Sequence, residues 1–183
     1  MAGNDYHFIT HWRVEGTLEE VHRLLSNAPD FVRWWPAVYL YVKELEAGDQ
    51  NGIGKVINLH TKGSLAYSLG WQYVVTEVSF PAGFAFEANG DFVGRGVWKF
   101  KQDRDCVNMT FDWMIRADKP LLRYLSFLLK PVFSANHRWA MAQGERSLRA
   151  ELARRRRLRG TPRRAGHLAA AVLVRAGALV GDD

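Results

Sequence analysis

Hydrophobic and polar residues alternate at the start of the chain. One face of the segment 7–14 carries mostly apolar side chains: Phe8, Thr10, Trp12 and Val14. A period of two predicts a β-strand with one buried face. Gly16 ends this pattern, and Thr17 with Glu20 three residues later predicts a capped helix start.

A second short helix and a series of strands follow. The segment 31–35 allows at most two helical turns before Pro36 stops the helix. Turn signals then separate six runs rich in β-branched and aromatic residues: 39–45, 55–61, 67–78, 84–88, 93–101 and 107–116. The short links between these runs predict antiparallel neighbours.

The C-terminal part has the period of a long helix. Asp118 can cap it with Pro120 in its first turn, and the pattern continues to about residue 157, with a kink or break expected at 130–131. One stripe of this helix is apolar except for a histidine: Phe133, His137, Met141, Gly144, Leu148 and Leu152. Together these elements predict an α+β fold in which a curved antiparallel sheet of about seven strands wraps around the long helix.

The net charge of +6 lies at the C-terminus of the 183-residue chain. Residues 1–148 hold 16 basic and 16 acidic residues, whereas residues 149–183 hold nine arginines against three acidic residues. A neutral folded part argues against specific nucleic-acid binding. We therefore expect a domain at 1–157 and a basic and apolar tail at 158–183.

Composition and motifs exclude several other classes. Cys106 is the single cysteine, and the first residues lack the basic and apolar regions of a signal peptide, so a cytoplasmic protein is expected. No nucleotide-binding or hydrolase motif is present, and we expect no cofactor. His7 and His11 would lie about 13 Å apart on a strand, too far to share a metal ion, so no metal site is expected.

The order of elements, with three local motifs, resembles the START-like (Bet v 1-like, SRPBCC) superfamily, in particular its polyketide cyclase/dehydrase-like branch. The motifs are the strand pair 90–98, Asp112-Trp113 in the last strand, and the helix segments 119–122 and 136–145. The resemblance covers roughly residues 6–155. It implies a helix-grip fold that encloses a cavity for a hydrophobic or amphipathic small molecule such as a lipid or polyketide.

Strand parity and the helix stripe nominate residues that would line such a cavity. The nominees are Tyr67, Trp71, Tyr73, Phe92, Trp98, Phe133, His137 and Met141. Each ring either fills the core or forms the wall of a ligand pocket. Gly94 and Gly96, which alternate with the rings, either ease sheet curvature or leave room for a ligand.

An enzyme is the alternative to a binding protein or carrier. Cyclase or dehydratase chemistry without a metal needs acid and base groups inside the cavity, for which His137, Tyr73 and Glu77 are the candidates. His137 is either a hydrogen-bonded core histidine or a group that contacts the ligand. Arg95 and Asp112 are expected in exterior or rim ion pairs.

The tail carries a possible second function. Residues 149–180 combine an arginine run with a short apolar stretch that could lie on an anionic membrane but is too short to span one. A solvated helix end with a loosely packed tail, or nonspecific nucleic-acid contact, are the alternatives. The sequence leaves the ligand and the oligomeric state open.

Overall fold

The computed structural model describes residues 5–64, 68–117 and 126–160. The chain divides into two compact units, residues 1–152 and 153–183. The first unit contains the whole sheet and the candidate site. In the second unit, residues 153–160 are the helical, arginine-rich end of the last helix. Residues 161–183, and with them most of the expected tail, lie outside the described residues.

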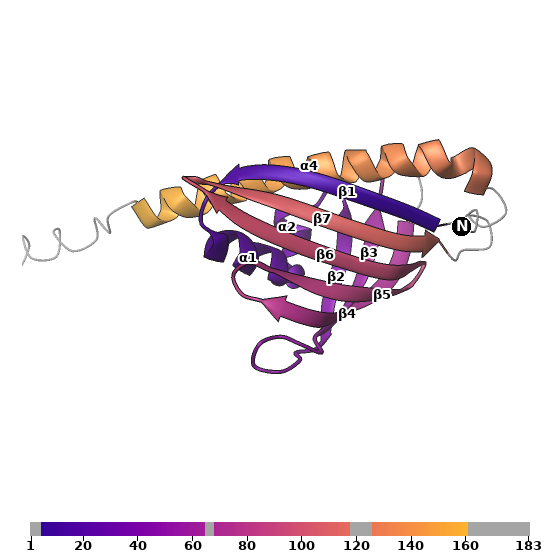
Figure 1. Cartoon of the computed structure of the whole chain (residues 1–183), viewed down its shortest axis with the longest axis horizontal. Coiled ribbons are helices and arrows are strands. Elements are labelled where there is room, and N and C mark those ends of the chain that lie inside the picture. Colours follow the sequence, from indigo (N-terminus) through magenta and orange to yellow (C-terminus); the bar gives the residue numbers. More distant parts are fainter. Residues whose placement is uncertain (1–4, 65–67, 118–125, 161–183) are drawn as a thin grey trace, which may run out of the picture. The chain divides into compact units, whose positions relative to one another are not determined.

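The first unit is built on one antiparallel sheet of seven strands (Figure 1). In chain order the elements are β1 (Asp5–Glu15), α1 (Leu18–Ser26), η1 (Ala28–Asp30), α2 (Phe31–Trp34), β2 (Tyr39–Glu46), β3 (Val56–Lys62), β4 (Ser68–Ser79), β5 (Gly83–Gly90), β6 (Phe92–Asp103), β7 (Cys106–Ala117) and α4 (Ser126–Gly160). The strands lie in the order β1-β7-β6-β5-β4-β3-β2, and every neighbouring pair is antiparallel. The predicted α+β architecture is confirmed.

The turn into α1 follows the capping pattern of the sequence. The Thr17 hydroxyl accepts a hydrogen bond from the Glu20 backbone N–H, and the Glu20 carboxylate accepts one from the Thr17 backbone N–H. These two bonds satisfy donors that a helix start leaves unpaired. Val21, Leu24 and Leu25 are then buried on the inner face of α1.

The part of α4 that belongs to the first unit lies along the sheet (Figure 1). The predicted stripe is its inner face: Phe133, Met141, Gly144, Leu148 and Leu152 are buried, and His137 is partly buried. Of the kink or break predicted at 130–131, the break is wrong, because α4 continues through Pro131. Proline there removes one backbone hydrogen bond close to the helix start, which the rest of a long packed helix tolerates. The predicted cap, Asp118 with Pro120, lies outside the described residues.

Polar side chains of α4 cover the edge of the sheet at β1. The Arg13 backbone N–H donates to the Glu145 carboxylate at 3.1 Å, and the Arg149 guanidinium donates to the Arg13 carbonyl at 2.9 Å. Glu145 and Arg149 also pair with each other. These contacts supply partners to a strand edge that would otherwise offer its backbone to another chain.

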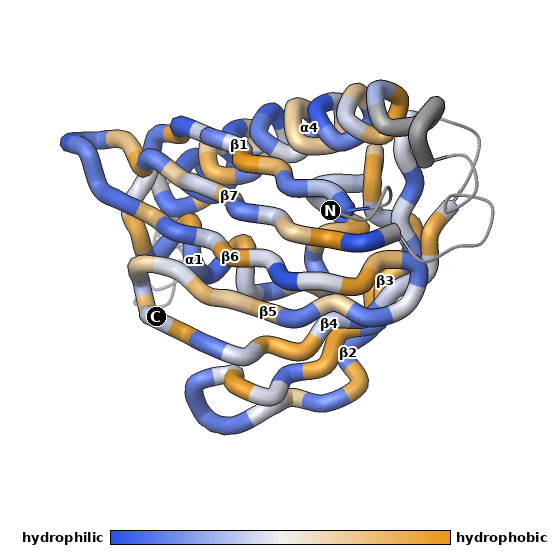
Figure 2. The backbone as a smooth tube through the Cα atoms, turned by 45° about the vertical axis from the view of Figure 1, so that its right-hand side comes forward, coloured by the Kyte–Doolittle hydropathy of each residue, from blue (hydrophilic) through white to orange (hydrophobic). Residues whose placement is uncertain are grey.

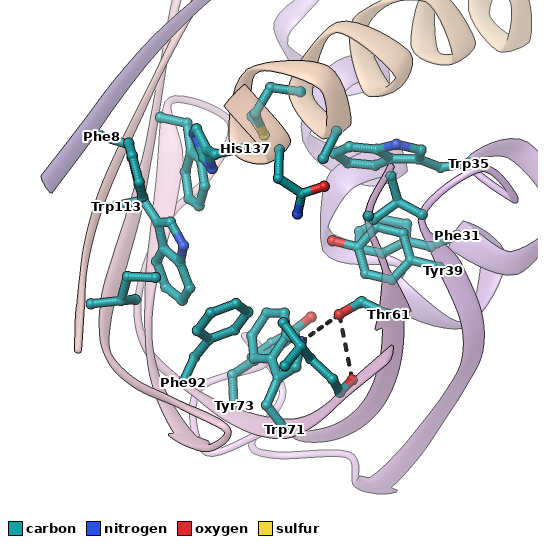
Figure 3. Close-up of a pocket in the computed structure, with 18 of the residues that line it drawn as sticks. Phe8, Phe31, Trp35, Tyr39, Thr61, Trp71, Tyr73, Phe92, Trp113 and His137 are labelled. Atoms are coloured by element: carbon teal, nitrogen blue, oxygen red, sulfur yellow. Dashed lines mark hydrogen bonds between the residues drawn. The ribbon is translucent and has the colours of Figure 1, made fainter. Parts of the chain in front are cut away.

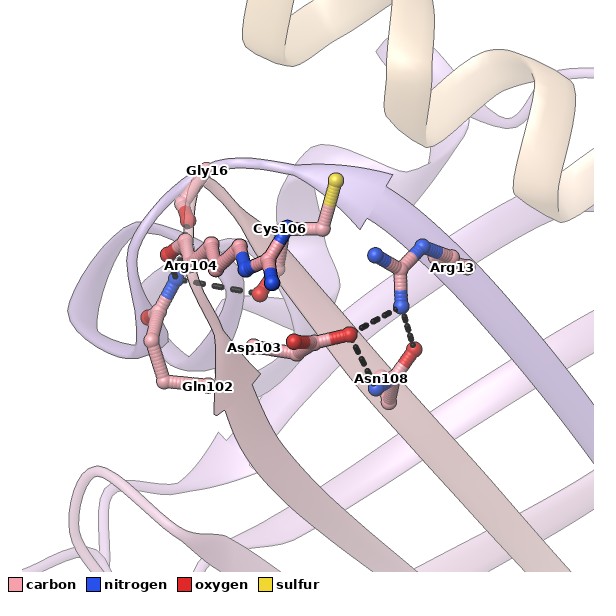
Figure 4. A network of polar contacts seen from close by, with 7 residues as sticks. All are labelled: Arg13, Gly16, Gln102, Asp103, Arg104, Cys106 and Asn108. Carbon is pink, nitrogen blue, oxygen red and sulfur yellow. Dashed lines mark hydrogen bonds and ion pairs between the residues drawn. The ribbon is translucent and has the colours of Figure 1, made fainter.

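Hydrogen bonds tie the β6–β7 turn to the loop before α1 (Figure 4). The Gln102 side-chain amide donates to the carbonyls of Gly16, Arg104 and Cys106, while its oxygen accepts from the Leu18 backbone. Beside this turn the Arg13 guanidinium bonds Asp103 and Asn108, and its hydrogen bond and positive charge lower the pKa of the Asp103 carboxyl. The turn therefore holds β1, β6, β7 and α1 in register.

Hydrophobic positions along the backbone follow the sheet and helix periods (Figure 2). The aromatic side chains of the inner face meet in one cluster that includes Trp12, Trp35 and Trp98. The ring centroid of Trp12 lies 5.6 Å from that of Trp35 and 5.1 Å from that of Trp98. Trp35 and Trp98 of this cluster also line the space between sheet and helix where the candidate site lies. Among the described residues, no helix is long and apolar enough to cross a membrane.

Candidate ligand-binding cavity

An internal cavity of about 140 Å³ lies between the sheet, the inner face of α4 and the residues around α2. Its wall is predominantly aromatic (Figure 3). The aromatic lining residues are Tyr6, Phe8, Phe31, Trp35, Tyr39, Trp71, Tyr73, Phe84, Phe86, Phe92, Trp98, Phe111, Trp113 and Phe133. An apolar concave site with a few polar groups is the usual form of a small-molecule site.

The residues nominated from the sequence come together in this wall. Trp71, Tyr73, Phe92, Trp98, Phe133, His137 and Met141 all line the cavity. They come from three separate elements, β4, β6 and α4, so the strand parity and the helix stripe pointed to the same space. Tyr67 lies outside the described residues.

Sequence reasoning missed the opposite wall, which comes from α2 and the start of β2. Figure 3 shows Phe31, Trp35 and Tyr39 facing the cavity across from His137 and Phe8. Strand and helix periods do not reveal this wall because Pro36 separates two short elements with different periods. The aromatic density of the segment 31–41 was the available signal.

Sequence reasoning also missed Trp113 and Phe111 on β7. The alternation that places Asp112 on the outer face of the sheet places both of these neighbours on the inner face. They lie on the inner face, with the ring of Phe111 stacked 4.4 Å from that of Trp98. The alternation of the strand 107–116 contained this information. Their position extends the aromatic wall across four adjacent strands, β4 to β7.

A buried hydrogen bond fixes the floor of the cavity. The Trp71 indole N–H donates to the Thr61 hydroxyl at 3.1 Å, and that hydroxyl also lies 3.5 Å from the Leu69 carbonyl (Figure 3). Thr61 thus acts as acceptor and donor at once, which uses its hydrogen-bonding capacity within the protein. Both groups are structural and hold the indole ring in place.

His137 is held by two contacts within the wall. Its Nε2 lies 3.2 Å from the Thr10 hydroxyl, and its ring stacks on Phe8 with centroids 4.2 Å apart. Burial, together with the positive charge of Arg138, lowers the pKa of His137 to about 4. The imidazole is therefore neutral at pH 7 and is both a hydrogen-bonded core histidine and part of the cavity surface.

Two phenols add uncharged polar groups to the wall. Tyr39 and Tyr73 lie across from His137, with the Tyr39 hydroxyl pointing into the cavity (Figure 3). Burial raises the pKa of both hydroxyls, and Tyr39 and Glu44 raise that of Tyr73 further. Both phenols are protonated at neutral pH and can donate a hydrogen bond to an uncharged acceptor.

The expectation that Glu77 faces inward is wrong. The pairing of β4 with β5 shifts between Val75, opposite Phe86, and Glu77, opposite Ala85, so that a bulge at Thr76 reverses the parity of the strand. Glu77 is consequently exposed and forms an ion pair with Arg95 on the outer face. Val78 instead packs against the core.

The other exterior predictions are confirmed. Arg95 pairs with Glu77, and Asp112 lies 2.8 Å from His7 on the same outer face. Gly96 does not leave room for a ligand, because a Cβ there would lie 2.4 Å from the ring of Phe86. The space beside Gly96 is filled by that ring.

One end of the cavity is bordered by a contact between α4 and the loop after β3. The Asn136 side-chain oxygen accepts hydrogen bonds from the Ser64 backbone N–H at 2.7 Å and from the Ser64 hydroxyl at 3.1 Å. Lys62, Gly63 and Asn136 all line the cavity. The described polar lining thus contains one ionic side chain, Lys62, which is exposed at this end.

The three catalytic nominees do not converge. Glu77 lies outside the sheet, while His137 and Tyr73 are neutral groups on opposite walls. Within the ranges that the structure describes, no group of three His, Cys, Asp or Glu side chains could hold a metal ion. The geometry supplies an apolar enclosure with hydrogen-bond donors rather than a paired acid and base.

Comparison with known proteins places this architecture. No family model matches the sequence, and a search of curated proteins finds no match. Solved structures do match. The Zhui aromatase/cyclase from Streptomyces sp. R1128 superposes with a TM-score of 0.65 at 17% identity, covering 85% of this chain and 98% of its own.

Two further structures show how wide this similarity is. A START superfamily protein from Mycobacterium smegmatis has a TM-score of 0.60 at 11% identity, covering 81% of this chain and 97% of its own. The di-domain ARO/CYC StfQ from the steffimycin biosynthetic pathway has a TM-score of 0.61 at 15% identity, and the match covers 82% of this chain and 53% of StfQ. The chain therefore has the START-like helix-grip fold, in the form that these aromatase/cyclases also have.

Proposed function

We propose that the first unit binds an uncharged small molecule with an aromatic or other apolar body in the cavity between the sheet and α4. The observation that carries this proposal is the wall itself, which combines a nearly continuous aromatic surface with uncharged polar groups. Binding, transport or sequestration then requires no chemistry of the protein. A polyketide or lipid fits this description, and the aromatase/cyclase neighbours favour a polyketide-like ring system.

The size of the cavity limits what fits without rearrangement. A dry apolar cavity of about 150 Å³ is known to hold benzene, so about 140 Å³ suits a single aromatic ring or a short acyl chain without rearrangement. Drug-sized ligands occupy pockets of about 300–1,000 Å³. A larger ligand therefore has to displace side chains of the wall or extend beyond it.

The charge of the ligand follows from the polar groups of the wall. His137, Tyr39 and Tyr73 are neutral at pH 7, and a charged group moved among them would lose its hydration without gaining a counterion. Lys62, the one charged side chain of the described lining, is exposed at the end near Asn136. We therefore expect uncharged ligands to bind better than anions of the same shape.

Fluorescence titration with 2-naphthol tests the proposal, with 2-naphthalenesulfonate as its charged counterpart. Ala140 on α4 lines the cavity, so Ala140→Trp fills it and should abolish 2-naphthol binding. Ala142→Trp places the same side chain on the exposed face of α4 and should leave binding unchanged. Equal binding to both variants, or equal affinity for the two probes, would reject the proposal.

A cyclase or dehydratase remains the second candidate because two of the neighbours are named aromatase/cyclase and ARO/CYC. It would have to use His137 and Tyr73 without Glu77. A neutral imidazole can accept a proton, whereas a phenol with a raised pKa donates a hydrogen bond to a carbonyl. Loss of product formation from a poly-β-ketone in His137→Phe, with 2-naphthol binding retained, would favour this candidate over simple binding.

The basic segment suggests a membrane-peripheral role for an otherwise cytoplasmic protein. Residues 154–159 of α4 carry five arginines, and about 1 kcal/mol per basic residue is gained near an anionic surface. A chain ending at Arg159 keeps these arginines and lacks the apolar run beyond them. If the apolar run is required, this truncated chain should no longer sediment with vesicles containing phosphatidylserine, whereas the full chain should.

A further inference from the structure

A second cavity of about 250 Å³ lies between α1, the β2–β3 loop (residues 47–55) and the end of β4. It shares two side chains, Tyr73 and Phe84, with the main cavity. The two spaces are therefore neighbours separated by these rings. Polar groups make up a larger share of the lining of the second cavity than of the main one, with Ser26, Gln50 and Asn51 among them.

The loop on one side of this cavity is held by its own hydrogen bonds. One Asp49 carboxylate oxygen accepts from the backbone N–H groups of Asn51 and Ile53, at 2.8 Å and 2.9 Å. Backbone bonds between Gly54 and Val75 and between Val75 and Lys55 join the loop to β4. A wall fixed in this way costs little further ordering when a ligand binds.

The same bonds decide the charge of the occupant. The Asp49 carboxylate already occupies loop N–H groups that would otherwise be free for a phosphate, and its negative charge repels another anion. The Lys55 ammonium lies 3.3 Å from Glu44, which neutralises it. The lining therefore carries no net positive charge, and the cavity is unsuited to a phosphate or carboxylate.

His22 adds a specific requirement to this cavity. The residue is 5% exposed, its ring is hydrogen-bonded to the Gly83 backbone, and its Nε2 has no hydrogen-bond partner among the residues that the structure describes. Burial lowers the pKa of the imidazole, so the ring is neutral. The nitrogen that bonds Gly83 donates, which leaves Nε2 as an unpaired acceptor. A buried acceptor without a partner is costly, and a ligand hydroxyl can supply the missing donor.

We propose that the second cavity is a subsite for the hydroxyl-bearing, uncharged end of an amphipathic ligand whose apolar body lies in the main cavity. The ligand then passes Tyr73 and Phe84, and its hydroxyl group lies near Ser26 and His22. This inference rests on the proposed function. It names the ligand class more narrowly as an apolar body that carries a terminal alcohol on a chain long enough to pass Tyr73 and Phe84, which the directly attached hydroxyl of 2-naphthol is not.

Competition against 2-naphthol with two uncharged chains tests the subsite. 1-Decanol has a terminal donor, whereas decyl methyl ether has the same chain without it. We expect decanol to bind the wild-type protein about three- to tenfold more tightly, the range that one net hydrogen bond supplies. His22→Phe removes the acceptor and should bring the two affinities together while 2-naphthol binding is unchanged.

A second variant tests the space rather than the hydrogen bond. Ser26→Trp fills the second cavity and should weaken decanol binding at least tenfold, with 2-naphthol affinity unchanged. Arg23→Trp adds the same ring on the exposed face of α1 and should have no effect. Unchanged decanol affinity in Ser26→Trp, or equal binding of decanol and its ether to the wild type, overturns the subsite. If 2-naphthol itself fails to bind, the proposed function fails instead.

Discussion

Gly144 of α4 lies against the indole of Trp35, and a Cβ added at Gly144 would lie 2.2 Å from the Trp35 Cζ2 atom. Trp35 is 4% exposed and packs against Trp12, Trp34 and Tyr39. Its ring therefore cannot shift without disturbing these neighbours or entering the main cavity that it lines. The close approach of α4 to the α2 region therefore depends on the absence of a side chain at this helix position.

Gly144→Ala should destabilise the protein although alanine favours a helix. Replacing glycine gains about 1 kcal/mol of helix propensity, whereas overpacking a filled core costs about 1–3 kcal/mol or more. We expect the clash to dominate, with a net loss of about 1–2 kcal/mol in the free energy of unfolding measured with urea. A gain in stability would show that Trp35 can move.

The reverse substitution two residues earlier is the matched control. Ala142 is exposed on the same helix, so Ala142→Gly changes propensity without touching the core. It should cost about 1 kcal/mol. Helix propensity alone predicts that Gly144→Ala gains stability and that Ala142→Gly loses it. A loss in both variants is therefore explained by packing at Gly144.

The ion pair between α2 and α4 should respond asymmetrically to mutation. Arg33 donates two hydrogen bonds to Glu151, at 3.1 Å and 2.9 Å, and the Glu151 side chain is 4% exposed against 44% for Arg33. Arg33→Met leaves a buried carboxylate without this partner, which costs about 3–5 kcal/mol. Glu151→Gln leaves an arginine that water can reach, so its loss should be smaller.

Urea unfolding of both variants and of the double variant measures this asymmetry. The double variant should be more stable than the sum of the single losses implies, since it no longer buries a carboxylate that has lost Arg33. Equal losses in the two single variants would mean that water reaches Glu151 once Arg33 is removed.

Acid should destabilise the protein through His137. Its pKa is about 4 in the folded chain against 6.5 for the free residue, so the unfolded state binds the proton first as pH falls. Stability is thus fully retained above about pH 6.5, falls between pH 6.5 and 4, and levels off below. The loss approaches about 3 kcal/mol, from 1.36 kcal/mol per pKa unit.

The His137→Phe variant isolates this contribution, since the phenyl ring can still stack on Phe8. Unfolding free energies measured from pH 8 to pH 4 should fall less steeply for the variant than for the wild type, by one proton over the window. His22, whose pKa burial also lowers, is present in both proteins and cancels in the comparison. Parallel profiles would mean that His137 is solvated in the folded protein.

The strand and helix periods predicted most of the fold because each element has one buried face. The α4 stripe from Phe133 to Leu152 and the strand alternation around Trp71 and Trp98 are of this kind. The failures have local causes. The bulge at Thr76 reverses the strand alternation, and the residue types around Glu77 do not indicate this bulge. Pro131 lies near enough to the start of α4 for the helix to continue through it.

The site was predicted in part for the same reason. Side chains that repeat along one element, such as Tyr73 and His137, could be nominated before their neighbours were known. The wall around Trp35 and Tyr39 could not, since it depends on how the turn at Pro36 folds back over the sheet. The unpaired Nε2 of His22 likewise depends on contacts with Gly83 that are distant in sequence.

The hydrogen bond between Trp71 and Thr61 should matter for stability mainly because its loss leaves a buried donor without an acceptor. Thr61→Val keeps the shape but leaves the buried indole N–H without its acceptor, which costs about 1–3 kcal/mol. Thr61→Ser keeps the hydroxyl and should cost less. A Trp71→Phe background has no indole N–H that could lose its acceptor, so Thr61→Val should be nearly neutral there. A double-mutant cycle from urea unfolding gives this coupling, and a coupling near zero would mean that water enters the floor and replaces the hydroxyl.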